Sequence, residues 1–434
     1  MKKRLSIAAV LGVAGLLAFL VAGYAGSAKS ATRVTAGVSP LPSSSCGPII
    51  YKGSGSPDFI VASDLPLQGA GRAQTIEMTK AMQWALASKK YMAGKYHIGY
   101  QSCDDSTAQT GGWDSAKCAA NARLYAGNKS VIGVVGTFNS GCAKIEVPVL
   151  NRSNPGPTAE VSPANTAVGL THGGPGAEAG EPNKYYPTGK RNYARVVAAD
   201  DIQGPADAMW AKSLGIKKVF VLNDKQTYGF GVATTFNRAA KKLGITVTGF
   251  KGWDAKQSSY EALGNSIKSS GATAVFLGGI ICNNGQKLMK DIKSVDANIQ
   301  LLLPDGFSDP KSNGTVADNA YVSVAGQPPN KLKGAGAAFV KSFGKQIGAT
   351  PNPYSAYAAQ GMLVMLEAVA KSGGQRANVA KALFGLKVKN GIIGSFTLNK
   401  NGDTSAGAIT IYKQANGKLN PLKTLTPPKS LTGG

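Results

Sequence analysis

Five loops of this 434-residue chain carry small and hydrogen-bonding residues close behind apolar runs. Backbone amides and hydroxyl groups at the start of a helix can hold a carboxylate, and an acidic side chain can hold an ammonium group. These loops therefore suit the binding of a small polar solute. Their sequences are DLPLQGAGRAQ, GTFNSGC, PTAEVSP, NDKQTYGFG and LPDGFSD.

The residue patterns of common enzymes do not occur in the sequence. GTFNSGCA lacks the Gly-x-Ser-x-Gly elbow of hydrolases, and the histidines, His97 and His172, have no evident partner. Neither a phosphate loop nor the dinucleotide-binding fingerprint is found. Without a paired CxxC motif, a zinc site is not expected. Acid pairs such as Asp200-Asp201 are more typical of helix caps or solvated faces. We expect no catalysis and no cofactor.

The loop after residues 219–222 is the most informative of the five. Val219 to Leu222 form a short apolar run, typical of a buried strand in a parallel sheet, and Asn223 and Asp224 end it. Tyr228 then stands between Thr227 and a glycine, where a helical pattern begins. Ligands of open α/β sheets bind at the carboxyl ends of strands, so Tyr228 is a candidate ligand contact.

The elements that position these loops alternate between strands and helices. This alternation predicts an α/β protein with two doubly wound parallel sheets. Late antiparallel strands are expected in 392–414, because alternating residues flank an Asn-Gly pair there. The predicted helices include 74–91, 114–125, 142–150, 201–214, 228–243, 259–270, 284–295, 332–347, 353–372 and 377–385.

The amino terminus has the pattern of an export signal. Lys2, Lys3 and Arg4 precede an uncharged stretch that ends at Gly23, and small residues follow. Residues 1–28 are thus predicted to be a cleaved signal peptide or an uncleaved anchor. The protein is expected in the periplasm or at the outer face of the membrane. Residues 29–57, rich in Ser, Gly and Pro, predict a flexible linker.

The chain is strongly basic. Removing residues 1–28 takes away three of the 48 basic residues, which leaves 45 against 23 acidic residues, or +22. The lysines are scattered through helices and loops without interleaved aromatic residues. We therefore expect a solvated basic surface with weak attraction to anionic envelope material, and no nucleic acid binding.

Five cysteines in an exported chain permit disulfides, and the odd number leaves at least one thiol unpaired or modified. Cys103 and Cys118 flank a loop and could pair, or Cys103 could pair with Cys142. We expect at least one disulfide, formed by Cys103. The roles of Cys46 and Cys282 stay open.

From about Asp58 to Lys413 the chain resembles the branched-chain amino acid type of solute-binding protein, the extracytoplasmic receptor of ABC transporters. NDKQTYGFG looks like the family's Asp-Lys-x-x-Tyr-Gly-x-Gly signature. Other stretches in the expected order are YQSCDDSTAQT, VIGVVGTFNSG, PTAEVSP, FLGG and LLLPDGF. The resemblance implies a bilobed type I periplasmic-binding-protein fold, with two doubly wound lobes, a three-segment hinge and a solute between the lobes.

In the first lobe, the resemblance implies that Ser140 holds the substrate carboxylate, with Asn139 and Gly141 supplying neighbouring backbone. Glu160 falls near a family threonine that contacts both ends of the amino acid. This departure would suit an extra ammonium or amide contact, which puts a simple leucine-type ligand in doubt. Arg72 and Gln74 would lie at the mouth of the cleft, where Arg72 could pair with a carboxylate.

In the second lobe, Tyr228 matches the tyrosine that covers the ligand on closure. Asp305 stands where a glutamate commonly pairs with the α-ammonium group. The aromatic residue expected after the Gly-Gly pair is missing, since Ile280 and Ile281 occupy that region.

The resemblance implies a monomeric receptor that delivers an amino acid, or a related amide or carboxylate, to a membrane permease. A ligand-sensing receptor of the same fold, without a transport role, is the alternative. The expected division is 58–199 with 327–390 for lobe 1, 200–326 with 391–420 for lobe 2, and 421–434 for a tail.

Overall fold

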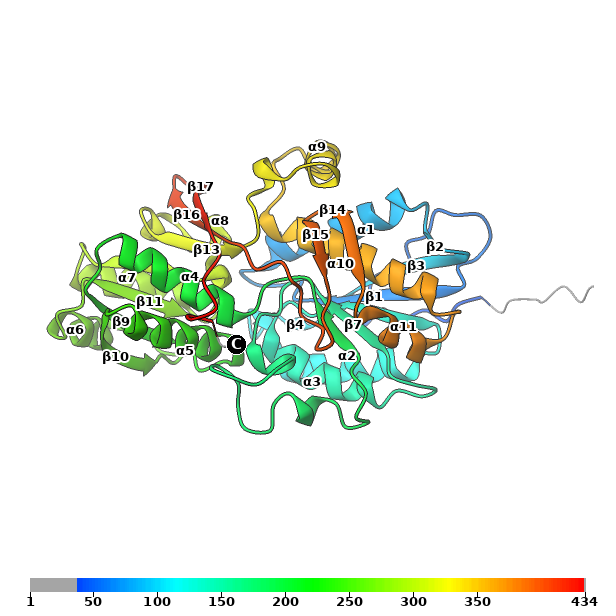
Figure 1. The fold of residues 1–434 in the computed structure, drawn as a ribbon, viewed down its shortest axis with the longest axis horizontal. Coiled ribbons are helices and arrows are strands. Elements are labelled where there is room, and N and C mark those ends of the chain that lie inside the picture. Colours follow the sequence, from blue (N-terminus) through cyan, green and yellow to red (C-terminus); the bar gives the residue numbers. More distant parts are fainter. Residues whose placement is uncertain (1–36, 433–434) are drawn as a thin grey trace, which may run out of the picture. The chain divides into compact units, whose positions relative to one another are not determined.

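The computed structural model describes residues 37–432, and within this range the chain forms two α/β lobes (Figure 1). The predicted signal segment, residues 1–28, lies outside the described residues. In residues 37–432, none of the helices has the length and apolar character needed to cross a bilayer.

Lobe 1 is built on a six-stranded sheet with the spatial order β2-β3-β1-β6-β7-β8. Only the β2–β3 pair is antiparallel. Val61 and Val135 belong to the apolar cluster beneath α1 and α10, whereas Ala62 and Val134 pack with Tyr125 of α2 on the opposite face. The strands are β1 (Phe59–Leu65), β2 (Met92–Ala93), β3 (Tyr96–Asp104), β6 (Val131–Gly136), β7 (Ala159–Ser162) and β8 (Tyr193–Arg195). The helices are α1 (Arg72–Ser88), α2 (Ser115–Gly127), α3 (Ser140–Asn151), α9 (Ala335–Ile347), α10 (Pro353–Lys371) and α11 (Arg376–Leu383).

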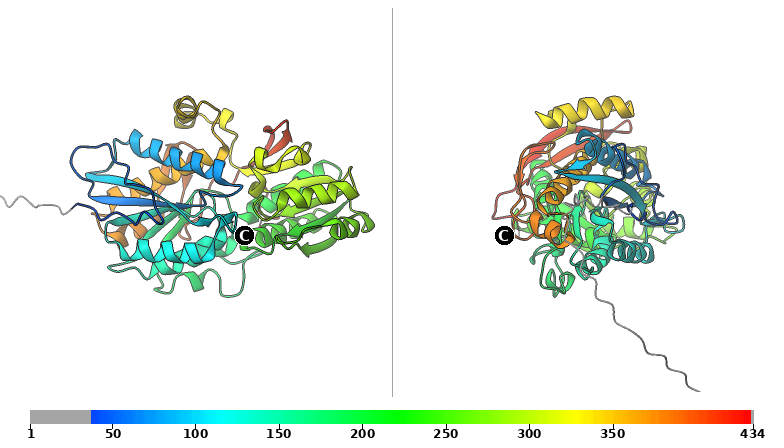
Figure 2. Two further views of the ribbon diagram at one scale, coloured as in Figure 1. Left: turned by 180° about the vertical axis from the view of Figure 1, so that it is seen from behind. Right: turned by 90° about the vertical axis from the view of Figure 1, so that its right-hand side faces the viewer.

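Lobe 2 is built on a seven-stranded sheet with the order β10-β9-β11-β12-β13-β16-β17. Phe276 stacks on Phe236 of α5 on one face, and Val275 packs with Leu288 of α7 on the other. Helices therefore cover both faces, which confirms the predicted pair of doubly wound lobes (Figure 2). The strands are β9 (Lys218–Asn223), β10 (Thr246–Gly252), β11 (Ala274–Gly278), β12 (Gln300–Leu303), β13 (Tyr321–Ala325), β16 (Ile409–Ala415) and β17 (Lys418–Leu425). The helices are α4 (Asp200–Ser213), α5 (Thr227–Lys242), α6 (Glu261–Ser269), α7 (Gly285–Val295) and α8 (Pro310–Asn313).

The late strands are antiparallel, as predicted, but they do not form a single hairpin around Asn401-Gly402. β16 pairs with β13 and β17, and β15 (Gly394–Thr397) pairs with β14 (Lys387–Gly391). β17 also extends the second sheet beyond residue 420, where we expected a tail. A second short pair joins β4 (Ser106–Thr107) to β5 (Gly112–Trp113).

The chain passes between the two large sheets three times: after β8, after β13 and before β16. The third passage begins later than the expected boundary at residue 391. The backbone N–H of Ile392 donates to Gln360 Oε1 of α10 over 2.7 Å, so β14 and β15 stay with lobe 1.

Residues 37–57 are not the flexible spacer that their composition predicts. Cys46 forms a disulfide with Cys103 of β3. The backbone N–H of Leu41 donates to Gln101 Oε1 over 2.7 Å, and Ile50 forms an antiparallel bridge with Tyr100. One covalent bond and several hydrogen bonds thus fasten the segment to β3. The part of the predicted linker before residue 37 lies outside the described residues.

The two disulfides differ from both pairings that the sequence left open. Cys103 does form a disulfide, but with Cys46, and Cys118 of α2 bonds to Cys142 of α3. Cys118 and Cys142 meet because α2 and α3 pack side by side on one face of the sheet. Cys282 is the free cysteine of the described residues.

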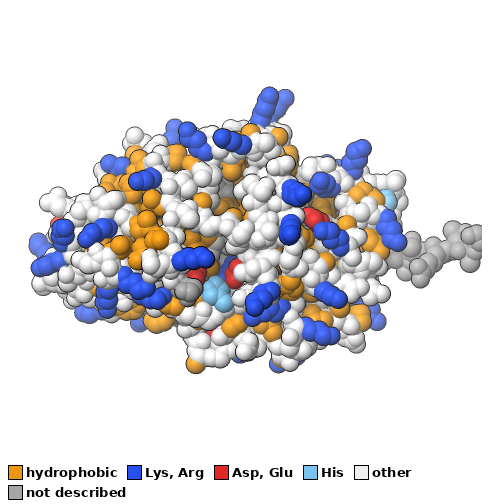
Figure 3. Space-filling view, in the orientation of Figure 1, with side chains coloured by type: hydrophobic (Ala, Val, Ile, Leu, Met, Phe, Trp, Pro, Cys, Tyr) orange, Lys and Arg blue, Asp and Glu red, His pale blue; other side chains and the backbone are white. Residues whose placement is uncertain are grey.

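Basic side chains are spread over both lobes on the face shown in Figure 3, and acidic ones are few there. Many acids are instead buried, among them Asp64, Asp105, Glu146, Glu160 and Asp200. Burial of acids leaves a surface that is more basic than the composition alone indicates.

Candidate functional site

Loops at the carboxyl ends of strands from both lobes enclose a cavity of about 20 Å³. Such a volume has room for about one water molecule. The lining residues are Phe138, Asn139, Ser140 and Ala164 from lobe 1 and Tyr228, Ile280, Asp305 and Gly306 from lobe 2.

The lobe 1 wall is the amino-terminal end of α3. Ser140 is the first helical residue, Asn139 is the residue before it, and the side chains of both are more than nine-tenths buried. The first N–H groups of a helix lack acceptors within the helix and carry partial positive charge. Ser140 Oγ accepts from the backbone N–H of Ala167 over 3.3 Å, which leaves its hydroxyl proton for another acceptor. This wall is therefore equipped for a carboxylate.

Gly141 contributes by its lack of a side chain. A Cβ atom there would stand 2.6 Å from the indole ring of Trp113. Only glycine lets that ring pack against the start of α3, so Gly141 is required by packing beside the cavity.

The lobe 2 wall centres on Asp305, at the start of a short helix, Asp305–Phe307, that follows β12. Its carboxylate accepts hydrogen bonds from Tyr228 Oη at 2.5 Å and from Tyr354 Oη. Burial raises the pKa of Asp305, and the bonds from the two tyrosines oppose that rise. Because Tyr354 belongs to α10 of lobe 1, Asp305 both presents a buried acceptor and joins the two lobes.

Two further polar groups near the cavity were missed by the sequence analysis. Asp200, the first residue of α4, is 0% exposed, and both of its carboxyl oxygens lack a hydrogen-bond partner. Burial raises its pKa well above the ordinary value, and the nearby charge of Asp305 adds to the shift. Thr166 Oγ1 is likewise buried, and it lies next to the Asp200 carboxyl group, where it opposes the rise of the Asp200 pKa. The expectation that Asp200-Asp201 caps a helix or faces solvent is wrong for Asp200, which is fully buried.

Glu160, an expected ligand contact, is not among the residues that line this cavity. Successive side chains of a strand point to opposite faces. Val161 of β7 lies on the α10 side of the sheet, near Gly361. Glu160 therefore points to the other face, where its carboxyl group lies among the buried acids near Asp64 and Glu146.

The two residues expected at the cleft mouth have different surroundings. Arg72 begins α1 and is exposed. Gln74 is buried, and its Nε2 donates to Ser308 Oγ of lobe 2 over 3.0 Å. Gln74 therefore bridges the lobes. Ile280, which occupies the region of the missing aromatic residue, lines the cavity with an apolar side chain.

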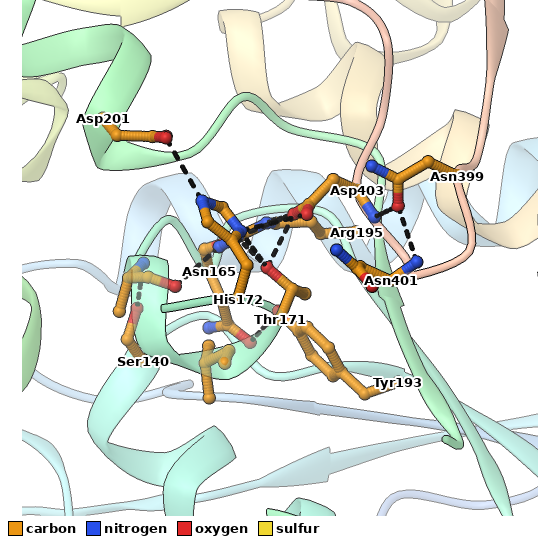
Figure 4. Close-up of polar contacts among 12 residues, drawn as sticks. Ser140, Asn165, Thr171, His172, Tyr193, Arg195, Asp201, Asn399, Asn401 and Asp403 are labelled. Carbon is orange, nitrogen blue, oxygen red and sulfur yellow. Dashed lines mark hydrogen bonds and ion pairs between the residues drawn. The ribbon is translucent and has the colours of Figure 1, made fainter. Parts of the chain in front are cut away.

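A polar network beside the cavity ties the segments that pass between the lobes (Figure 4). His172 Nε2 lies 3.1 Å from Asp201 Oδ2 of α4, and its Nδ1 lies 3.1 Å from Asp403 Oδ2. Arg195 pairs with Asp403 over 2.8 Å, and Thr171 Oγ1 donates to the same carboxylate. Burial opposes a charge on His172, but its bonds to Asp201 and Asp403 outweigh burial and raise its pKa from 6.5 to about 9.

His172→Gln is expected to reduce the free energy of unfolding by up to about 3 kcal/mol near pH 6. The folded-state pKa is raised, so the stabilisation is complete below pH 6.5 and is lost as the pH rises through about 9. Denaturant titrations of both proteins from pH 6 to 9.5 measure the difference, which should shrink across that window. Asp201→Asn, which removes one of the two partners, should cause part of the same loss. A difference independent of pH would contradict a charged His172.

Comparisons with known proteins agree with this geometry. A family model described as periplasmic binding protein matches residues 64–418. The chain is 28% identical over 303 residues to a Leu/Ile/Val-binding protein homologue of Brucella melitensis. The aligned region covers 69% of this chain and 77% of the relative.

Two solved structures show the same fold. A leucine-binding protein of Thermotoga maritima has a TM-score of 0.73 at 20% identity, with 85% of this chain and 99% of that chain covered. A solute-binding protein of R. palustris in complex with benzoate has a TM-score of 0.69 at 17% identity, with 85% and 96% covered.

Proposed function

The chain belongs to the periplasmic binding protein family, and from this premise we propose that it is the solute receptor of an ABC transporter. Its ligand in this proposal is an amino acid or a related small amide or carboxylate, which it delivers to the membrane permease. Family membership places a solute-binding protein outside the cytoplasm.

One observation carries the choice of an amino acid: the cavity has walls of opposite electrostatic character. The start of α3, with Ser140 and Asn139, offers positive partial charge and a hydroxyl group to a carboxylate. Asp305, on the opposite lobe, offers a buried acceptor to an ammonium group. An α-amino acid has both groups on one carbon atom, so it can bridge the two walls.

A ligand whose only charged group is a carboxylate fits this arrangement less well. Asp305 lines the cavity, and the unpartnered carboxyl group of Asp200 lies near it. A buried carboxylate repels another negative charge unless it takes up a proton. For this reason we favour an amine-bearing solute over an aromatic acid of the kind bound by the R. palustris protein.

Binding would require the lobes to separate and close again, because the cavity of about 20 Å³ is smaller than an amino acid. Tyr228 would cover the ligand from lobe 2, and Gln74 would rejoin Ser308 on closure. Arg72, exposed at the start of α1, would meet the solute at the entrance.

Identification of the natural ligand tests the proposal most directly. Native mass spectrometry of the exported protein, followed by calorimetric titration, should find an amine-bearing solute that binds more tightly than benzoate. A preference for benzoate, or for another acid without an amine, would overturn the amino-acid assignment while leaving a solute receptor in place.

Cys282 provides a second readout, for closure. It belongs to lobe 2 but lies against lobe 1, since a Cβ atom on Gly112 would stand 3.7 Å from its Sγ. A saturating ligand should therefore slow the reaction of Cys282 with a maleimide. An unchanged rate would count against closure around the ligand.

A further inference from the structure

A second hollow, a groove of about 480 Å³, lies in lobe 1 and shares no lining residue with the solute cavity. Its walls come from the end of α1 and from β2 on one side, and from α10, the start of α9 and β14 on the other (Figure 1). Pockets that bind small ligands usually have volumes of about 300 to 1,000 Å³. The groove therefore has the size of a ligand site.

The floor of the groove is apolar. Leu366 of α10, Val388 of β14 and the nearby Ile392 are buried members of the core, and Leu363 packs against them. Met92 of β2 lines the same space and is half-buried. A ligand with an apolar body would remove the remaining exposed surface of these side chains from water, which favours binding.

One buried polar side chain at this floor has a hydrogen-bonding group to spare. Gln360 of α10 is 2% exposed, and its Oε1 accepts from the backbone N–H of Ile392 over 2.7 Å. A Cβ atom on Gly391 would collide with that oxygen, so glycine is what allows this contact.

The contact with Ile392 fixes the orientation of the Gln360 amide and leaves its nitrogen free. Within residues 37–432, Gln360 Nε2 donates no hydrogen bond, and it is not fully enclosed by protein atoms. Because Gln360 lines the groove, this nitrogen opens on the ligand space. Nearly all buried polar groups have partners, so a free amide N–H at this position calls for an acceptor.

The charge at the rim of the groove is positive. Lys89 and Lys389 line it, are exposed, and form no ion pair within residues 37–432. The acidic lining residue, Glu367, is already paired with Lys371 over 2.7 Å. The rim therefore favours an anion over a cation.

We propose that this groove binds a second small molecule, a monocarboxylate with an apolar chain, of the medium-chain fatty acid class. Its carboxylate would accept a hydrogen bond from Gln360 Nε2 and lie near the ammonium group of Lys389. Its chain would cover the apolar floor. A cation with the same chain would meet two unpaired lysines, and a carboxylate without a chain would leave the floor exposed.

Octanoate is the probe that tests this assignment. Calorimetric titration of the full-length exported protein, at octanoate concentrations below micelle formation, should show one molecule bound per chain. Octylamine, which has the same chain length and a positive charge, should not bind measurably. Acetate, which has the carboxylate without the chain, should not bind either.

Gln360→Glu keeps an oxygen for the N–H of Ile392 but replaces the free amide nitrogen by a second oxygen. It should weaken octanoate binding at least about tenfold, because the ligand loses a donor and meets a buried acceptor. Lys389→Glu should weaken binding roughly fivefold, as expected for a charge on the surface. Lys251→Glu is the matched control, since Lys251 is also exposed but lies in lobe 2, and it should bind octanoate like the wild type.

Failure of octanoate to bind the wild-type protein would overturn the proposal, and so would equally tight binding of octylamine. Equal octanoate affinity in Gln360→Glu and Lys251→Glu would overturn it as well. If Gln360→Glu fails to fold, the comparison of Lys389→Glu with Lys251→Glu still decides the question.

The solute cavity needs a separate control, because it could also accept a carboxylate. Ser140→Ala should bind octanoate as tightly as the wild type. Weaker binding in Ser140→Ala, with unchanged binding in Gln360→Glu, would place the probe in the solute cavity and overturn the proposal. The groove shares no residue with that cavity, so the groove assignment can fail while the proposed transport role stands.

Discussion

Asp305→Asn is expected to weaken the binding of an amino acid about 10- to 100-fold. A charge-assisted hydrogen bond contributes about 1.5 to 3 kcal/mol, and each 1.4 kcal/mol changes the dissociation constant about tenfold. The asparagine side chain keeps the size of Asp305 but removes the charge that an ammonium group would meet. Calorimetric titration with the copurified solute measures the change.

Asp305 also joins the lobes, so this variant needs a control that separates charge from closure. Tyr354→Phe removes the hydrogen bond from α10 and leaves the carboxylate in place. It should cost less affinity than Asp305→Asn, and so should Ser140→Ala, because the backbone N–H groups of α3 remain. Unchanged affinity in a folded Asp305→Asn protein would reject the ammonium-binding role.

Replacement of Cys46 and Cys103 by serine is expected to lower the free energy of unfolding by about 3 to 4 kcal/mol. The disulfide closes a loop between residues 57 positions apart, which restricts the unfolded chain. It also holds residues 37–57 against β3, so the double variant should expose that segment to proteases. Guanidinium titration and limited proteolysis measure the two effects.

Cys282→Ser is the control for that variant, since Cys282 forms no disulfide in the described residues. It should unfold at nearly the wild-type guanidinium concentration. A double variant with wild-type stability and an uncleaved segment 37–57 would show that hydrogen bonds such as Leu41 to Gln101 suffice to hold the segment.

Much of the fold could be predicted because its signals are local. Within β9, residues Val219 to Leu222 are an uninterrupted apolar run, and α5 begins at Thr227, one residue before the expected start. Tyr228 and Asp305 were placed near the cavity for a related reason. Both follow parallel strands of one sheet, β9 and β12, and the carboxyl ends of such strands meet at one edge.

The surroundings of the buried acidic side chains could not be predicted from the sequence in the same way. Glu160 and Ser162 lie two residues apart on β7 and share a face of the sheet, but the sequence does not say which layer covers that face. Asp200 resembles an ordinary helix-capping acid in sequence. It is buried because both lobes cover the first turn of α4: the backbone N–H of Asp200 donates to the carbonyl of Thr166, and Thr235 Oγ1 of α5 donates to the carbonyl of Asp200.

By itself, the sequence determined the alternation of strands and helices, the two doubly wound sheets and the polar loops at strand ends, because periodicity and turn residues act over a few positions. Only the tertiary structure decided that Cys103 bonds to Cys46, that residues 37–57 pack on β3, and that four acids gather inside lobe 1. These features join residues far apart in the chain. Which residues meet depends on how whole helices and strands pack together, and local sequence patterns do not predict that packing.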